Sequence, residues 1–172
     1  MKPFKTVAIV GPESTGKSDL ATALSVKLNG CLVTEMARIY LDEINRPYRE
    51  EDLLTIAQLQ VAEEDKMLSD PNCNLLVCDT NLLVIKIWSL HKYQQCHPWI
   101  EDQMTKRSYD LHLLCNIDLP WQADPLREYP HMREFFFNWY HSALIDQKVN
   151  YEIITGQNEK RAENALKIIK AK

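Results

Sequence analysis

Short apolar runs alternate along the chain with longer segments in which apolar residues recur every three or four positions. Continuous apolar runs are typical of strands buried on both faces, whereas the longer period is that of an amphipathic helix. The five runs lie at residues 6–10, 31–33, 75–78, 111–117 and 151–154. Because helical segments separate these runs, the pattern predicts successive βαβ units and therefore a parallel sheet.

The helical pattern is most distinct at residues 49–68, where Leu53, Ala57, Val61 and Leu68 share one face. Further helices are predicted at residues 20–28, 82–90, 98–106, 133–146 and 159–169. The length of 172 residues is that of one domain. We therefore expect a single domain, residues 1–172, with an α/β, three-layer P-loop NTPase fold around a five-stranded parallel sheet.

The segment between the first strand and the first helix is GPESTGKS, residues 11–18. It fits the pattern G-x-x-x-x-G-K-[ST], in which backbone N–H groups and the helix N-terminus surround a polyphosphate. Lys17 is expected to reach the β- and γ-phosphates, and the Ser18 hydroxyl to hold Mg²⁺. The sequence therefore predicts a site for a nucleoside triphosphate. The residues expected to contact it are Gly11, Glu13, Ser14, Thr15, Gly16, Lys17 and Ser18.

Charged residues follow the second and third strands, at the sheet edge where ligands bind in such folds. Glu35 is a candidate general base for an attacking hydroxyl, and Arg38 can hold a phosphate or pair with Glu35. Asp79 ends an apolar strand and is expected to orient magnesium or its water, although an Asp that caps the next helix is an alternative account. A surface ion pair is the alternative for Glu35 and Arg38.

The segment after the fourth strand contains Pro120, Pro125 and Pro130, which predict irregular backbone. A short lid is expected here, because phosphoryl transfer requires the exclusion of water and a cation near the transferring group. Arg127 would be that cation. The alternative is a surface loop in which Arg127 pairs with Asp124.

Two further features permit more than one interpretation. Gly156 lies in the turn after the fifth strand, where backbone groups can contact the nucleotide base, but a plain strand-to-helix turn explains this glycine equally well. Gln60 and Glu64 share a helical face and point into the site or, as is commoner, into solvent.

Composition limits the possible partners. The formal net charge of −4 gives no basic footprint for nucleic acid, and no apolar stretch approaches the length of about 18 residues that spans a membrane. The five cysteines contain no C-x-x-C pair and lack zinc-ligand spacing, so free thiols and a cytoplasmic location are expected. The N-terminus leads directly into the first strand, which predicts no signal peptide.

Four motifs together resemble the nicotinamide riboside kinase domain of the NadR family of P-loop nucleoside kinases, an AAA-like ATPase domain. They are residues 11–18, 34–40, 78–81 and 120–127, and the resemblance covers nearly the whole chain. It implies transfer of the γ-phosphoryl group of ATP to the ribose 5′-hydroxyl of nicotinamide riboside, giving nicotinamide mononucleotide for NAD biosynthesis. ATP and Mg²⁺ are the implied cofactors, and a small nucleoside is the implied partner.

The expected roles divide into three sets. The catalytic set is Lys17, Glu35, Asp79 and Arg127, with Ser18 and Asp79 at the metal and Arg127 and Gly156 also at the nucleotide. The positive pyridinium ring of nicotinamide riboside favours aromatic faces and acidic groups. The acceptor set is Glu35, Arg38, Tyr40, Asp79, Asn81, Trp121 and Asp124, with Trp88 as a further aromatic candidate.

This chain departs from the family pattern at two places. Members with assigned kinase activity often carry a second Asp where Asn81 stands, and two acids where this chain has Ala123 and Asp124. Both changes remove negative charge near the expected acceptor pocket, which leaves a kinase for another nucleoside or small metabolite as the first alternative. The second is a nucleotide-binding regulatory module. Larger relatives carry DNA-binding and adenylyltransferase domains, neither of which is expected here.

Overall fold

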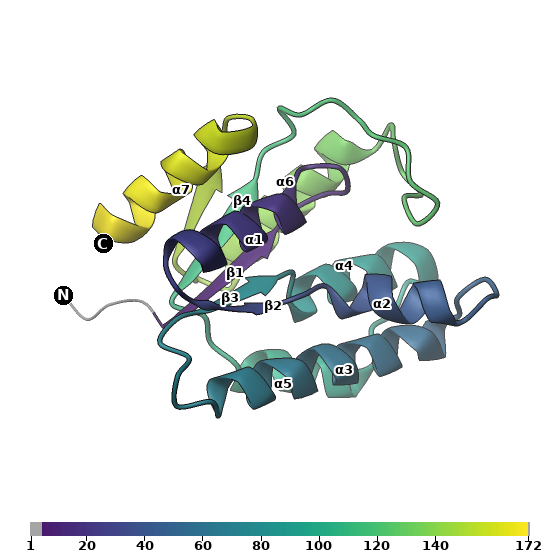
Figure 1. The fold of residues 1–172 in the computed structure, drawn as a ribbon. Helices are drawn as coiled ribbons and strands as arrows, with labels where there is room; N and C mark the ends of the chain where they lie inside the picture. Colours follow the sequence, from purple (N-terminus) through teal and green to yellow (C-terminus); the bar gives the residue numbers. More distant parts are fainter. Residues whose placement is uncertain (1–4, 172) are drawn as a thin grey trace.

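Residues 5–171 are described in this computed structural model, and they form five strands and seven helices (Figure 1). The strands are β1 Thr6–Val10, β2 Cys31–Val33, β3 Leu76–Asp79, β4 Leu111–Cys115 and β5 Tyr151–Ile154. The helices are α1 Lys17–Lys27, α2 Met36–Glu43, α3 Glu50–Leu68, α4 Leu82–Tyr93, α5 Pro98–Lys106, α6 Arg133–Asp146 and α7 Asn158–Ala171.

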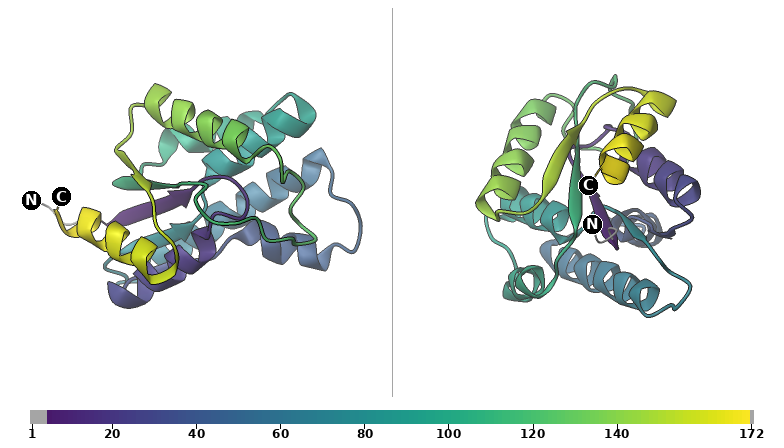
Figure 2. Two further views of the ribbon diagram at one scale, coloured as in Figure 1. Left: turned by 90° about the horizontal axis from the view of Figure 1, so that it is seen from above. Right: turned by 90° about the vertical axis from the view of Figure 1, so that its left-hand side faces the viewer.

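All neighbouring strands are parallel, in the order β2-β3-β1-β4-β5, which confirms the predicted five-stranded parallel sheet. Helices α1 and α7 cover one face, and α4 and α6 cover the other (Figure 2). Val7 and Ile9 of β1 pack toward α1 and α7, whereas Val10 packs toward α4 and α6. Because both faces are covered, the apolar run of β1 is continuous rather than alternating.

The strand order brings together the loops that later form the site. From β1 the chain adds β2 and β3 on one side and then crosses to β4 and β5 on the other. In a parallel sheet, a crevice opens where the connections diverge in this way, beyond the carboxyl ends of the strands. Residues that follow β1, β2 and β4 line a cavity at this edge of the sheet.

The structure differs from the prediction in the bounds or presence of several elements. Helix α2 was not predicted, because it has only eight residues, too few to show a clear period, and Ala37 is its one buried residue. Strand β4 ends at Cys115, two residues before the end of the predicted run 111–117, and the following residues through 132 contain neither helix nor strand, in agreement with the irregular backbone that the prolines predicted. Helix α1 begins at Lys17, inside the predicted phosphate loop.

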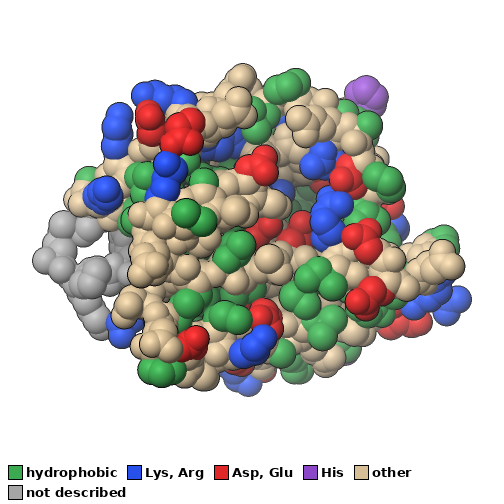
Figure 3. Space-filling model, in the orientation of Figure 1, with side chains coloured by type: hydrophobic (Ala, Val, Ile, Leu, Met, Phe, Trp, Pro, Cys, Tyr) green, Lys and Arg blue, Asp and Glu red, His purple; other side chains and the backbone are tan. Residues whose placement is uncertain are grey.

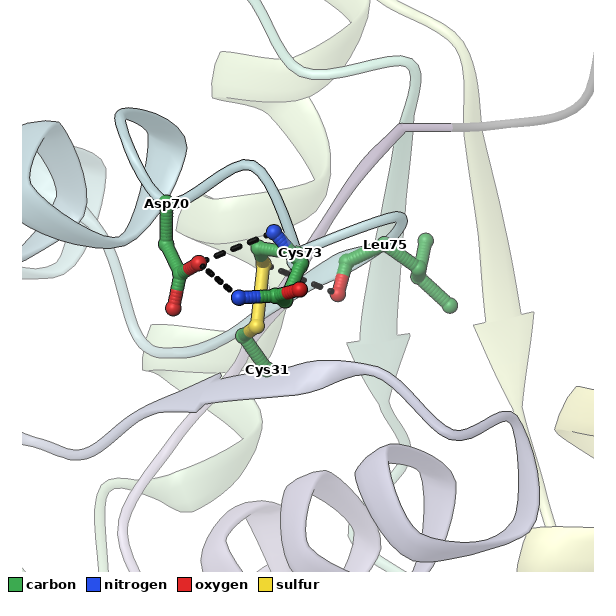
Figure 4. Close-up of a disulfide and its surroundings, with 5 residues drawn as sticks. Cys31, Asp70, Cys73 and Leu75 are labelled. Carbon is green, nitrogen blue, oxygen red and sulfur yellow. Dashed lines mark hydrogen bonds between the residues drawn. A yellow bond between two sulfur atoms is a disulfide. The ribbon is translucent and has the colours of Figure 1, made fainter.

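The cysteine prediction was wrong for two of the five. Cys31 and Cys73 form a disulfide with a Cα–Cα distance of 5.6 Å (Figure 4). They meet because β2 pairs with β3, and the loop before β3 turns back at Asp70 so that Cys73 lies beside the start of β2. A separation of 42 residues hides this proximity in the sequence.

The other three cysteines are free thiols, of which Cys78 and Cys115 are buried in the core. Across residues 5–171, no helix is both long and apolar enough to cross a membrane. The cytoplasmic location stays a prediction.

We expect reduction of the disulfide to lower the free energy of unfolding by about 2–4 kcal/mol, because the bond closes a long loop of the unfolded chain. Urea titration with and without dithiothreitol measures this difference, and Cys96→Ser is the control. Peptide mapping of the non-reduced protein should recover Cys31 linked to Cys73. An unlinked pair, or equal stability under both conditions, would contradict the assignment.

Candidate active site

The phosphate loop, residues 11–18, leaves β1 and enters α1 through two glycines with positive φ. Gly11 has φ of 139°, and a Cβ there would lie 3.0 Å from the backbone oxygen of Cys115. Gly16 has φ of 71° and is the N-cap of α1. Both positions favour glycine, because a side chain is strained in this region. The Thr15 hydroxyl and the Lys17 ammonium both donate to the Pro12 carbonyl at 2.8 Å, which keeps the loop curled.

A cavity of about 530 Å³ opens beside the phosphate loop. Its walls include the whole loop together with Glu35, Arg38, Trp88, Arg127 and Tyr140. The cavity therefore joins the ends of β1 and β2 to α4, α6 and the segment after β4. On the face that Figure 3 shows, acidic and basic side chains are interspersed rather than separated by sign.

Glu35 is the N-cap of α2, at the carboxyl end of β2, and is half-buried in the cavity wall. Burial raises the pKa of its carboxyl group, the charge of Lys17 opposes this, and the charge of Asp79 adds to it. The three charged groups thus form one electrostatic cluster. The Glu35 side chain makes no capping hydrogen bond to α2, and the residue lines the cavity.

Asp79 is the last residue of β3 and is 4% exposed. Burial raises the pKa of its carboxyl group, while a hydrogen bond from Ser18 and the charge of Lys17 lower it. Among the described residues, its Oδ1 atom has no hydrogen-bond partner. The alternative account, in which Asp79 caps α4, was wrong because Asn81 is that cap and accepts from the Leu83 amide at 3.1 Å.

The lid segment, defined here as residues 119–129, lies against the phosphate loop. The Glu13 carboxylate accepts the backbone N–H groups of Glu128 and Tyr129, each at 3.1 Å. Ser14 Oγ accepts the Gln122 amide at 2.8 Å. These bonds connect the third and fourth positions of the phosphate loop to the backbone of the lid segment.

Arg127 projects from the lid segment over the loop. Its Nη1 atom donates to the Gln122 carbonyl at 2.6 Å and approaches Ser14 Oγ at 3.5 Å. Asp124 instead pairs with Arg38, at 3.1 Å. The structure therefore has no Arg127–Asp124 ion pair and no ion pair between Arg38 and Glu35. Through its ion pair with Asp124, Arg38 connects α2 to the lid segment.

Several expected acceptor residues lie outside the cavity wall. The Tyr40 hydroxyl donates to Asp52 at 2.8 Å. Asn81 is 3% exposed, and its amide nitrogen lies 3.3 Å from His112, so it caps a helix within the core. Trp121 is half-buried in the lid but does not line the cavity. The substitution at position 81 therefore leaves the charge of the cavity wall unchanged.

Gly156 also has a structural partner. Its amide donates to Asp118 Oδ2 at 2.6 Å, while the following residues Gln157 and Asn158 reach the cavity. The solvated face expected for Gln60 and Glu64 was wrong, since each is 1% exposed. Gln60 Oε1 accepts the amide of Met36, which fixes the backbone directly after Glu35.

Sequence reasoning missed most of the aromatic wall. Trp88 lies on α4, Phe136 and Tyr140 lie one turn apart on α6, and Tyr129 ends the lid segment. Burial raises the pKa of Tyr140, so its hydroxyl stays protonated and available as a donor near Glu35. The sequence predicted a helix at residues 133–146, but not that its buried residues Phe136 and Tyr140 reach the cavity.

Arg161 was also missed, although it fixes the phosphate loop. It is 2% exposed, and its guanidinium donates to the backbone oxygens of Thr15, Asn116 and Gly156 and to the Asp118 carboxylate. One side chain thus joins the segments after β1, β4 and β5. An indication was present in the sequence, because Arg161 adjoins Ala162 and precedes Ala165 by one turn on the apolar face of α7.

These features define a P-loop domain, and the comparisons with known proteins agree. The sequence profile of the family described as AAA domain matches residues 6–161, so the chain belongs to that family. The resemblance to NadR is confirmed. The trifunctional NAD biosynthesis/regulator protein NadR of Salmonella typhimurium is 27% identical over 135 residues, which are 74% of this chain and 32% of that protein.

Two solved structures are similar over nearly the whole chain. NadR in complex with NR matches with a TM-score of 0.85 over 98% of this chain and 51% of that one, at 18% identity. NadR in complex with NAD and AMP-PNP matches with a TM-score of 0.79, also at 18% identity, over 98% of this chain and 49% of that one. The chain thus spans about a third of its curated relative and half of the solved NadR chains.

We expect Arg161→Gln to lower the free energy of unfolding by about 2–4 kcal/mol, because it leaves several carbonyls and the Asp118 carboxylate without their donor. Lys160→Gln is the matched control, since that lysine lies next to it on α7 and is exposed. Chemical denaturation of both variants measures the difference. Equal stabilities would show that Arg161 does not hold the loop.

Proposed function

We propose that this protein is an ATP-dependent phosphotransferase that phosphorylates the ribose 5′-hydroxyl of nicotinamide riboside to give nicotinamide mononucleotide. The observation that carries the proposal is the single cavity in which the phosphate loop, Glu35 and an aromatic wall meet. The relation to NadR, and the complexes of NadR with NR and AMP-PNP, support the same donor and acceptor. A small nucleoside is the proposed partner.

The phosphate loop would bind the triphosphate of ATP through its backbone N–H groups and Lys17. In the structure, the Lys17 ammonium donates a hydrogen bond to the Pro12 carbonyl, which is a neutral acceptor. A phosphate oxygen would replace that carbonyl with a negatively charged acceptor, which gives a stronger hydrogen bond. The residues Gly11, Glu13, Ser14, Thr15, Gly16 and Ser18 line the same cavity. Gln157 and Asn158 line the cavity and, in our proposal, would contact the adenine in place of Gly156.

Glu35 is the proposed general base. A carboxyl group whose pKa is raised accepts a proton more readily than an ordinary one, and the nearby Lys17 keeps the carboxylate form accessible. In our proposal it removes the proton of the 5′-hydroxyl as the oxygen attacks the γ-phosphorus. The bond between the γ-phosphorus and the β,γ-bridging oxygen breaks, and ADP leaves. The protonated Glu35 is also the better neighbour for the increased negative charge of the product phosphate.

Ser18 and Asp79 would hold Mg²⁺, directly or through water. The buried and unpartnered Oδ1 of Asp79 fits this role, since a hard cation or its water supplies the missing partner. The ion would neutralise charge on the β- and γ-phosphates. Ser18 and Asp79 would then act only by holding it in register with the loop.

Arg127 would stabilise negative charge on the transferring group, and the lid segment would exclude water. Both roles fit the position of the lid against Ser14 and Glu13. Arg38 and Asp124 would hold the lid near α2 rather than contact the riboside.

The pyridinium ring would lie against the aromatic wall, with Trp88 and Tyr140 in place of Trp121 and Tyr40. Glu13 and Glu35 line the same cavity and give the acidic surroundings that a cationic ring favours. A neutral nucleoside would gain from the aromatic contact but not from the charge. A kinase for another nucleoside stays the alternative.

We expect nicotinamide riboside to be phosphorylated at least about tenfold faster than uridine, cytidine or adenosine, as the cation–π contribution implies. ATP consumption with mass detection of the phosphorylated product measures this, and Lys17→Ala is the inactive control. A preference for a neutral nucleoside would leave only a P-loop kinase of other specificity. No stimulation by any nucleoside would favour the regulatory module.

Glu35→Gln should lower kcat by about 10²-fold or more, the usual contribution of a general base. In the native protein, activity should decline as the pH falls through a pKa above the ordinary carboxyl range, because burial favours the protonated form. Asp79→Asn should instead shift the dependence on Mg²⁺ to higher concentrations. Rates measured against pH and Mg²⁺ distinguish the two, and exchanged phenotypes would exchange the roles.

A further inference from the structure

Tyr48, in the connection between α2 and α3, joins the cavity wall to the lid segment. Trp88, which lines the cavity, donates from Nε1 to the Tyr48 hydroxyl at 2.6 Å. The Tyr48 hydroxyl in turn lies 2.7 Å from Glu128 Oε2, in the lid. The two rings also contact each other edge-on, with centroids 4.8 Å apart.

The direction of this hydrogen-bond chain is fixed by the groups involved. An indole N–H only donates and a carboxylate only accepts, so the single proton of the Tyr48 hydroxyl must point to Glu128. Although burial works against it, the hydrogen bonds from Tyr48 and Lys92 hold the pKa of Glu128 below its usual value. Glu128 is therefore charged and draws on both donors.

Lys92 closes the same arrangement from α4. Its ammonium donates to Glu128 Oε1 at 3.0 Å and lies 3.7 Å from the centroid of the Tyr48 ring. Lys92 thus forms an ion pair with Glu128 and a cation–π contact with Tyr48. Lys92 and Trp88 are one turn apart on α4. The residue that lines the cavity and the residue that binds Glu128 of the lid therefore belong to the same helix.

The chain continues from the lid to the phosphate loop. The Glu128 amide, in the same residue that Tyr48 binds, donates to the Glu13 carboxylate at 3.1–3.2 Å. The acceptor wall, the lid and the phosphate loop are therefore connected through Trp88, Tyr48, Glu128 and Glu13. No role had been assigned to Tyr48 or Glu128 from the sequence.

We infer that Tyr48 and Glu128 are positioning residues that hold the lid in register with the acceptor wall, so that the lid covers the phosphates when a ring lies against Trp88. This rests on the proposed function in taking the wall beside Trp88 as the acceptor site. A ring that stacks on Trp88 stabilises the orientation of the Trp88 side chain. In that orientation, the indole N–H donates its hydrogen bond to the Tyr48 hydroxyl. When the hydrogen bond between Tyr48 and Glu128 is lost, the lid segment is released and water reaches the phosphates.

The test is Tyr48→Phe, which keeps the ring contacts with Trp88 and Lys92 but removes the hydroxyl. Tyr93→Phe is the matched control, because its hydroxyl lies in the same cluster and reaches only the Tyr48 backbone oxygen, at 3.4 Å. ADP and phosphorylated product are measured together, with ATP and nicotinamide riboside as substrates. Hydrogen exchange of a peptide covering the lid segment is followed without nucleoside.

We expect Tyr48→Phe to lower kcat about tenfold or more, as for a small misplacement of positioned groups, with the KM for ATP within twofold of the native value. The ratio of ADP to product should rise above one, and the lid amides should exchange faster. A loss of stability alone would not raise that ratio. Glu128→Gln, which alters an exposed lid residue, should give the same pattern even if Tyr48→Phe folds poorly.

The inference is overturned if Tyr48→Phe and Glu128→Gln both match Tyr93→Phe in product ratio and lid exchange. A failure of the proposed function looks different. In that case nicotinamide riboside is not phosphorylated by the native protein, yet Tyr48→Phe still accelerates lid exchange and the hydrolysis of ATP alone. Product formation by the native protein thus tests the proposed function, whereas the product ratio and lid exchange of the variants test the inference.

Discussion

The phosphate loop depends on one buried guanidinium. Arg161 donates to backbone oxygens after β1, β4 and β5 and pairs with Asp118, so one side chain connects three loops that leave the same edge of the sheet. A planar group with several fixed donors suits this position better than a lysine ammonium. The sheet sets where these loops begin, and Arg161 sets how they lie relative to one another. The cavity and the approach of the lid both depend on that arrangement.

The acidic groups of the site reduce the stability of the fold. Burial raises the pKa of Asp79 and Glu35 above their values in the unfolded chain. The stability that their protonated forms provide is therefore fully present below the pKa of the unfolded chain. It is lost as the pH rises through the pKa of the folded protein. At neutral pH both carboxyl groups are kept near Lys17 at a cost, as expected where function rather than packing selects a residue. A phosphate-bound metal would offset that cost at Asp79.

The sequence predicted the parts of the protein that follow from local pattern. The central strand β1 is a continuous apolar run because both faces of the sheet are covered there, and the glycines of the phosphate loop stand where the backbone requires positive φ. Contacts between distant segments were not predictable in this way. Asn81 was expected at the acceptor, yet it caps α4 against His112, and Cys31 meets Cys73 only because β2 lies beside β3.

The lid shows the same limit. Its prolines predicted irregular backbone, but its partners Arg38, Tyr48 and Lys92 come from three other segments of the chain. The aromatic residue that the sequence favoured, Trp121, is in the lid but outside the cavity, whereas Trp88 lines it. The sequence pattern predicted that glycine, charged and aromatic residues would line the cavity. Only the packing of α4 and α6 showed which of them reach it.

The most direct test of the account is a crystal structure with AMP-PNP, Mg²⁺ and nicotinamide riboside bound together. We expect the ribose 5′-hydroxyl at about 2.6–3.2 Å from a Glu35 oxygen and aligned with the γ-phosphorus, with the pyridinium ring against Trp88. Asp79 and Ser18 should lie at the metal, and Arg127 at the γ-phosphate. A riboside whose 5′-hydroxyl lies away from Glu35, or whose ring leaves the aromatic wall empty, would contradict the account.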